Sequence, residues 1–182
     1  VNLLKRSCES YRLTISDILY NAWGILLGKY SGEDDIVFGT TVSGRNIKLD
    51  GIENMVGLLI NTIPFRLKLS SSKSLIDIVK DNSVKIRERV DSENIPLQNI
   101  LDYSGHRGEE IFESIFVVEN YPIDKSIFQE HEGFTIKAFT INEVTNYKLT
   151  VNAFLNDEIE INFNYSTLAY DRDFIENIGR HY

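Results

Sequence analysis

A nearly uninterrupted apolar run at residues 114–118, Ser-Ile-Phe-Val-Val, is the feature that most constrains the fold. A strand of this composition must be covered on both faces, as the inner strands of α/β proteins are. Segments of helical periodicity and segments rich in β-branched residues interleave along the rest of the chain. This alternation predicts an α/β fold in which helices pack on a mixed sheet.

Apolar residues recur at helical spacing in several segments. One of these segments predicts a helix that opens near Ser16, which we expect to be its N-cap, and ends at Ser31 and Gly32. Another segment, residues 74–90, places Leu75 on one apolar face together with Ile78, Val79, Ile86 and Val90. Further helices are expected at residues 3–8, from Pro96 to Leu101 and after Asp171.

Residues 35–41 are rich in β-branched side chains and predict a strand, and the next strand is expected at residues 59–69. Pro64 lies inside the second strand, and because proline cannot donate to a sheet ladder, we expect that strand at an edge or a bulge. Residues 148–154 and 158–165 alternate with period two around a turn, which predicts a hairpin that makes the sheet partly antiparallel. One more strand is expected at residues 134–141.

The composition excludes several classes of function. A net charge of -8 disfavours a non-specific nucleic-acid binder, which needs a basic face, and disfavours docking on an anionic membrane. No apolar run reaches the roughly 18 residues that a membrane span needs. Cys8 is the only cysteine, so no intrachain disulfide can form, and a reducing cytoplasm is the expected location.

The residues that could carry out chemistry form no recognisable set. The three histidines, His106, His131 and His181, lack a second His or Cys at the spacing of a zinc site, so we expect no metal. The glycines do not match a phosphate-binding fingerprint. Taken alone, these patterns indicate an α/β domain without an evident catalytic centre.

Two stretches nevertheless resemble segments of a known family. Residues 34–45, Asp-Asp-Ile-Val-Phe-Gly-Thr-Thr-Val-Ser-Gly-Arg, resemble a core segment of the condensation domains of nonribosomal peptide synthetases. Residues 55–66, Met-Val-Gly-Leu-Leu-Ile-Asn-Thr-Ile-Pro-Phe-Arg, follow at the family's spacing. The family pattern Gly-x-x-x-Asn-Thr, followed by Pro and Arg, is matched at Gly57, Asn61, Thr62, Pro64 and Arg66.

Three further stretches agree in order with the same family. Residues 95–97, Ile-Pro-Leu, resemble the centre of its His-Gln-Asp-Tyr-Pro-Phe segment, with Ser92 at the position of the His. Residues 112–122 resemble a strand typical of domains that join two L-configured residues. Residues 145–149 resemble a Thr-Asn-Tyr-Asp-Leu segment, with Lys in place of Asp. The Arg-Asp-x-Ser-Arg-Asn-Pro-Leu motif is nearly absent around residues 106–108.

The resemblance implies a fold like that of chloramphenicol acetyltransferase, in which two similar α/β lobes enclose a tunnel. Carrier proteins bring thioester substrates to the two ends of that tunnel on 4'-phosphopantetheine arms. The catalytic signature of the family, His-His-x-x-x-Asp-Gly, lies in the N-terminal lobe, and no His-His pair occurs in this chain. We therefore expect residues 1–182 to be the C-terminal lobe, without a catalytic residue of its own.

The resemblance also assigns candidate residues to the tunnel or the lobe interface. Asn61 and Thr62 would offer polar groups to the pantetheine arm or the nascent amide, or else satisfy neighbouring backbone groups. Arg45 or Arg66 would pair across the interface with the acid of the missing signature, or else form an ion pair within the lobe. Glu119 and Asn120 would face the tunnel mouth, or else form a solvated strand end.

The implied function is amide-bond formation between an upstream acyl or peptidyl thioester and a downstream aminoacyl thioester. The chain itself would bind no cofactor, and its partners would be the N-terminal lobe, two peptidyl carrier proteins and an adjacent adenylation domain. Two alternatives stay open: a lobe for epimerisation, heterocyclisation or CoA-dependent acyl transfer, and a non-catalytic docking or scaffold module of the same fold. A lobe without its partner should expose an apolar patch with embedded polar groups, and should self-associate.

Overall fold

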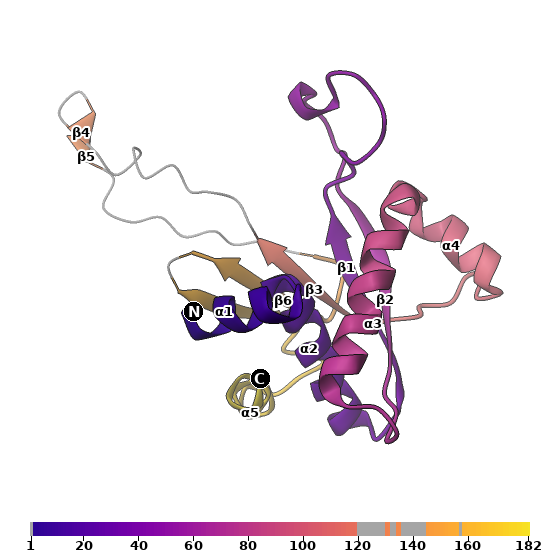
Figure 1. Ribbon diagram of the computed structural model, residues 1–182, viewed down its shortest axis with the longest axis vertical. Coiled ribbons are helices and arrows are strands. Elements are labelled where there is room, and N and C mark those ends of the chain that lie inside the picture. The colour runs from indigo at the N-terminus through magenta and orange to yellow at the C-terminus, as the bar shows by residue number, and fades with distance from the viewer. Residues whose placement is uncertain (1, 120–129, 132–133, 136–144, 157) are drawn as a thin grey trace.

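The computed structural model describes residues 2–119, 130–131, 134–135, 145–156 and 158–182. Its centre is a five-stranded sheet with the order β2-β1-β3-β6-β7 (Figure 1). The inner pairs β1–β3 and β3–β6 are parallel, and the outer pairs β1–β2 and β6–β7 are antiparallel, which confirms the predicted mixed sheet. The strands are β1 (Asp35–Val42), β2 (Asn61–Lys68), β3 (Ser114–Glu119), β6 (Leu149–Leu155) and β7 (Ile159–Tyr165).

Helices pack around this sheet, and a short second ladder lies apart from it. The ladder pairs β4 (Glu130–His131) with β5 (Phe134–Thr135). Only this part of the strand expected at residues 134–141 falls within the described residues. The helices are α1 (Asn2–Tyr11), α2 (Ile15–Ser31), α3 (Leu75–Glu88), α4 (Leu97–Ser104) and α5 (Arg172–His181), with 3-10 turns at Ile52–Asn54 and Arg89–Ser92.

The main core lies between α2, α5 and one face of the sheet. Trp23 of α2 is completely buried, and the centroid of its ring lies 5.9 Å from the ring centroids of both Phe116 and Tyr182. Ile115 and Val117 alternate with Phe116 along β3 and belong to a second buried cluster, on the other face. The prediction that this strand is buried on both faces is therefore confirmed.

Pro64 lies in β2, which is an edge strand of the sheet. Its register partner in β1 is Gly39. Because an edge strand pairs on one side only, a residue without a backbone N–H is tolerated there. The edge position predicted from the proline is confirmed.

The start of α2 differs from the prediction, because Thr14 and not Ser16 is the N-cap. The Thr14 hydroxyl accepts a hydrogen bond from the backbone N–H of Asp17 at 3.0 Å. The Asp17 carboxylate accepts one from the backbone N–H of Thr14 at 2.8 Å. This reciprocal capping box satisfies two N–H groups at the start of the helix, whereas Ser16 already lies within its first turn.

Three other helices depart from the expected pattern. Leu75 opens α3 but is 63% exposed, so its predicted place on the packed face is wrong, and the buried face begins one turn later at Ile78 and Val79. The helix α4 continues three residues beyond the predicted end at Leu101. Asp171 occupies the N-cap position of α5, but its side chain makes no capping hydrogen bond.

Candidate functional site

Three of the candidate residues gather at the end of the sheet where β1 stops and β2 begins. Asn61 and Thr62 open β2, and the register pairs them with the last two residues of β1. Arg45 follows β1 by three residues. Arg66 pairs in register with Val37 and so lies near the opposite end of β1. The structure places Arg45, Asn61 and Thr62 at one end of the sheet and separates them from Arg66.

Asn61 ties β2 to the segment that precedes α4. Its side-chain N–H group donates to the backbone carbonyl of Glu93 at 2.9 Å and to that of Ile95 at 2.8 Å. Thr62 beside it is half-buried and lies opposite Thr41. The amide nitrogen of Asn61 is thus occupied by two backbone carbonyls, which leaves its own carbonyl oxygen and the Thr62 hydroxyl as the polar groups available to a ligand.

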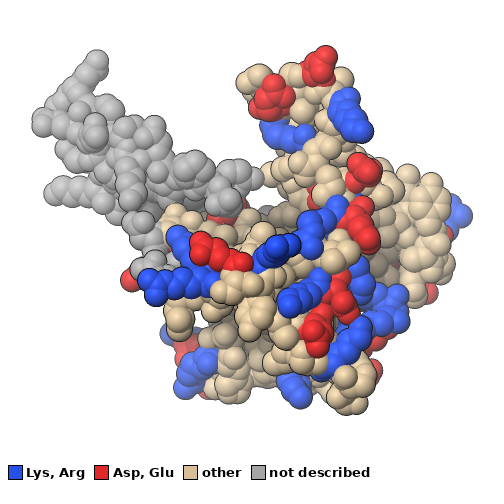
Figure 2. Space-filling view, viewed as in Figure 1, with Lys and Arg blue, Asp and Glu red and all other residues tan. Residues whose placement is uncertain are grey.

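Arg45 shapes the loop that joins β1 to β2, residues 43–60. Its guanidinium donates to the backbone carbonyl of Ile52 and, at 2.9 Å, to that of Met55. These bonds hold the first residue of the 3-10 turn Ile52–Asn54 and the residue that caps its end. The loop projects well away from the sheet (Figure 1), and its tip carries charges of both signs (Figure 2).

The returning arm of the loop is apolar and unprotected. Val56 and Leu58 are fully exposed, and Met55 and Ile60 are exposed as well. Single exposed apolar residues are common on soluble proteins, but a run of them on one projecting arm marks an interaction site. This arm, Met55 to Ile60, is called the apolar arm below. Asn61 and Thr62 continue directly from it, in line with the expected apolar patch with polar groups beside it.

Arg66 forms an exposed ion pair with Asp35 across the β1–β2 edge. Its Nε and Nη2 donate to the two carboxylate oxygens at 2.8 and 2.6 Å, and the Lys68 ammonium lies 3.4 Å away from the same carboxylate. The hydrogen bonds from Arg66, with smaller contributions from the nearby positive charges, lower the pKa of Asp35 to about 2. Both side chains are largely solvent-exposed, so this is a pair within the lobe that contributes little to stability.

Of the last two candidates, the structure describes only Glu119, at the end of β3. Glu119 is the final residue of that strand, is half-buried and pairs in register with Phe154. Asn120 lies outside the described residues. Because β1 and β3 are parallel, their carboxyl ends lie at the same end of the sheet, which is the end that holds Asn61 and Arg45.

Two histidines make single polar contacts at the surface. His106 Nδ1 lies 2.8 Å from a carboxylate oxygen of Glu109, and His181 Nδ1 lies 2.8 Å from the Tyr30 hydroxyl. Within the described residues, no group of three His, Cys, Asp or Glu side chains is arranged to hold a metal ion. Of the helices described, none is long and apolar enough to cross a membrane.

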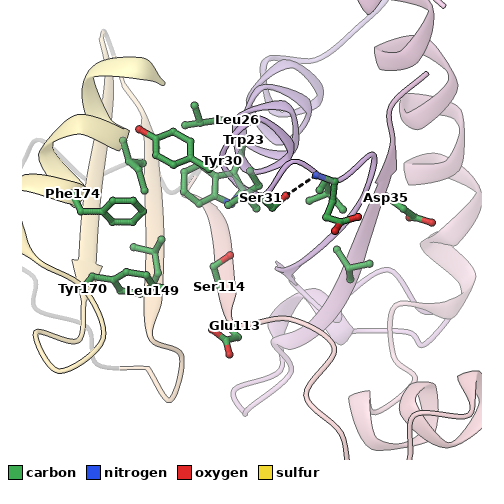
Figure 3. Close-up of a pocket in the computed structure, with 15 residues that line it drawn as sticks. Trp23, Leu26, Tyr30, Ser31, Asp35, Glu113, Ser114, Leu149, Tyr170 and Phe174 are labelled. Atoms are coloured by element: carbon green, nitrogen blue, oxygen red, sulfur yellow. Dashed lines mark hydrogen bonds between the residues drawn. The ribbon is translucent and has the colours of Figure 1, made fainter. Parts of the chain in front are cut away.

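A cavity of about 440 Å³ opens at the opposite end of the sheet (Figure 3). Trp23 and Tyr30 of α2 line it together with Phe174 of α5, and Asp35 and Ser114 mark the amino ends of β1 and β3. None of the five candidate residues that the structure describes lines it. A smaller cavity of about 280 Å³ beside α4 includes Asn146, Tyr147 and Lys148 from the family-like stretch.

Sequence reasoning missed Glu93, which is only 5% exposed. Its carboxylate accepts a hydrogen bond from the Asn46 side chain at 2.7 Å and lies 3.9 Å from Nε of Arg89. The sequence offered no pattern around Glu93, because a lone acid between two helical segments is most often solvated. Its burial arises from the fold, which brings the loop 43–60 against the segment before α4.

Comparison with family models and with known proteins identifies the family of the chain. The model of the family "Condensation domain" matches residues 1–182. Gramicidin S synthase 2 of Brevibacillus brevis is 35% identical over an alignment of 182 residues that covers 98% of this chain and 4% of that protein. Bacitracin synthase 3 of Bacillus licheniformis is 33% identical, covering 99% of this chain and 3% of its own length. The chain thus spans a few hundredths of the length of these relatives.

Solved structures share the fold. A four-domain nonribosomal peptide synthetase, crystallised with AMP and glycine, matches 97% of this chain and 15% of its own, with a TM-score of 0.80 and 14% identity. The first condensation domain of the calcium-dependent antibiotic synthetase matches 97% of this chain and 39% of its own, with a TM-score of 0.73 and 15% identity. At these identities the likeness concerns the fold.

Proposed function

Because this chain belongs to the condensation-domain family, we propose that it works as the C-terminal lobe of a domain that forms amide bonds between carrier-bound thioesters. The amine of the downstream aminoacyl thioester attacks the carbonyl carbon of the upstream thioester. A C–N bond forms, the C–S bond breaks, and the upstream pantetheine thiol leaves with the proton released by the amine. The base that handles this proton belongs to the partner lobe, since this chain has no His-His pair.

The apolar arm is the observation that carries this proposal. Burying a Val or Leu side chain that is otherwise exposed stabilises by roughly 1.5–3 kcal/mol. Val56 and Leu58 contribute none of this free energy in the chain alone, because both side chains are fully exposed. A second lobe seated on the arm provides the burial and brings the adjoining Asn61 and Thr62 to the tunnel.

Within the proposed tunnel, the Thr62 hydroxyl is our candidate for the polar contact with the pantetheine arm or the nascent amide. The Asn61 amide nitrogen already serves two backbone carbonyls, so Asn61 positions β2 and offers only its carbonyl oxygen. Glu119 and Asn120 are proposed to border the tunnel mouth, because β3 ends at Glu119 on the same side of the sheet. Holding both thioesters in this tunnel lowers the barrier by converting an encounter between two carriers into a local step.

Of the two arginines, Arg45 is the stronger candidate for a contact with the acid of the partner lobe. It lies in the loop that bears the apolar arm, and its side chain is only half-buried. Arg66 already holds the Asp35 carboxylate with two hydrogen bonds near the other end of β1. An arginine that already donates two hydrogen bonds to one carboxylate has fewer N–H groups left to bind a second acid.

The proposed partners follow from the same assignment. Two peptidyl carrier proteins would present substrates on 4'-phosphopantetheine, and an adenylation domain would supply the downstream residue. We propose a cytoplasmic location because the single cysteine, Cys8, is a free and buried thiol.

The direct test is the paired substitution Val56→Ser and Leu58→Ser, made in this chain for association and in the two-lobed domain for dipeptide formation. The exposed Leu168, on the turn between β7 and α5, provides the matched control as Leu168→Ser. We expect association with a co-produced N-terminal lobe to weaken at least about tenfold in the paired variant, since each side chain loses its buried contact. Dipeptide formation should fall with it, while Leu168→Ser leaves both unchanged. Equal association in all three proteins would remove the apolar arm from the interface.

A further inference from the structure

The two arms of the loop 43–60 touch at their base. Gly44 has a φ of 67°, and a Cβ placed there would lie 1.8 Å from the carbonyl oxygen of Leu59. Val56 and Leu58 lie beyond this contact and are fully exposed. Because the tip of the loop makes few contacts with the body, its direction is set where the arms leave the sheet.

Glu93 joins both ends of the loop to the body. Its Oε2 accepts a hydrogen bond from Nδ2 of Asn46, on the outgoing arm, at 2.7 Å. Its backbone carbonyl accepts one from Nδ2 of Asn61, directly after the returning arm, at 2.9 Å. One residue, only 5% exposed, therefore connects the start and the end of the loop through its side chain and its backbone.

A buried carboxylate is stable only where charge or hydrogen bonds compensate it. Asn46 supplies the hydrogen bond, and the Arg89 guanidinium, which lies over the Phe65 ring at 6.0 Å, supplies the opposite charge. Nε of Arg89 is buried and has no hydrogen-bond partner in the described part of the chain. Loss of the Glu93 carboxylate would remove a counter-charge from this largely buried cation beside the loop base.

We infer that Glu93 is a positioning residue that fixes the angle at which the loop presents Val56 and Leu58 to the partner lobe. The identity of the partner rests on the proposed function, whereas the fixed direction of the loop is a property of this chain. Glu93 acts through Asn46 and Asn61, and it lies outside the main core between α2 and α5.

Distances between two spin labels test this inference in the full chain. One label is attached at Val56→Cys and the other at Asp173→Cys, on the exposed first turn of α5, with Cys8→Ser removing the native thiol. The chain with native Glu93 is expected to give one narrow distance distribution. Glu93→Ala should broaden it at least about twofold, because the loop base opens locally while the sheet stays folded.

Three further variants separate positioning from a general loss of stability. Asp91→Asn changes an exposed acid two residues away, in the 3-10 turn that Glu93 caps, and should leave the distribution narrow. Asn46→Ala should reproduce the broadening, and Glu93→Gln, which keeps an acceptor for Asn46, should stay narrower than Glu93→Ala. If Glu93→Ala fails to fold, Asn46→Ala carries the test, because that side chain is exposed.

A narrow distribution in folded Glu93→Ala or Asn46→Ala overturns the inference. Dipeptide formation by the two-lobed domain, measured for the same variants, distinguishes a failure of this inference from a failure of the proposed function. Broadening together with reduced dipeptide formation supports both. Broadening with full activity upholds the positioning by Glu93 and overturns the assigned role of the apolar arm.

Discussion

Gly44→Ala should destabilise the chain more than the same change at any open glycine of the loop. Gly44 and Gly51 both lie in the loop 43–60 with positive φ, 67° and 79°. A methyl group at Gly51 would meet nothing within 4 Å, so Gly51→Ala costs only the left-handed backbone conformation, about 1 kcal/mol. The pair therefore isolates the effect of the close approach at Gly44.

At Gly44 the new Cβ would lie 1.8 Å from the Leu59 carbonyl oxygen, and contacts under 3.0 Å are essentially never seen. The two arms must part by more than about 1 Å, which strains or breaks the hydrogen bond from Asn46 to the buried Glu93 carboxylate. Hydrogen bonds to charged groups contribute about 1.5–3 kcal/mol. Added to the backbone strain, the loss is about 3 kcal/mol, or roughly 6–12 °C in Tm for a chain of this size.

Urea and thermal unfolding of the two variants measure this difference. Gly44→Ala should lower the free energy of unfolding by about 2 kcal/mol more than Gly51→Ala does. Equal losses in the two variants would show that the arms do not touch at Gly44, and the reasoning about the loop base would be refuted.

Other outcomes follow from individual contacts. Thr14→Ala removes the capping box of α2 and should cost about 1 kcal/mol of unfolding free energy in urea. Phe116→Ala empties a fully buried site and should cost about 3–5 kcal/mol, whereas Leu168→Ala at an exposed site should stay within about 0.5 kcal/mol. Because the folded-state pKa of Asp35 is depressed to about 2, its stabilisation is present above its ordinary pKa of 3.8 and lost as the pH falls from there toward 2. A carboxyl NMR titration should show that pKa return toward 3.8 in Arg66→Gln, and a pKa that stays near 2 would deny the role of Arg66.

The sequence predicted the sheet better than it predicted the helix ends. The strand at 114–118, the edge position of Pro64 and the late hairpin follow from apolar runs, proline chemistry and period-two alternation, which act locally. The N-cap at Thr14 was missed because Thr14 and Ser16 are both good capping residues of similar free energy, although only Thr14 has an acid, Asp17, at capping-box spacing. Helix ends depend on such small differences in free energy.

The candidate site was predicted only as a set of positions. Family-like motifs indicated Asn61, Thr62 and Arg45, and the structure places them at one end of the sheet. The motifs could not show that the Asn61 amide nitrogen is occupied, nor that Arg66 pairs with Asp35. Glu93 carried no local signal, because its burial comes from a loop that begins almost fifty residues earlier in the chain, with Asn46 as its partner.

The central claim is that this chain supplies half of a condensation domain and needs the other half for chemistry. Two loaded carrier proteins should be incubated with the purified chain, with a separate N-terminal lobe that bears the His-His-x-x-x-Asp-Gly signature, and with both together. Mass spectrometry of the carriers then measures dipeptidyl thioester. We predict product only when both lobes are present. Product formed by either lobe alone, or no product after a folded N-terminal lobe has bound this chain, would contradict the account.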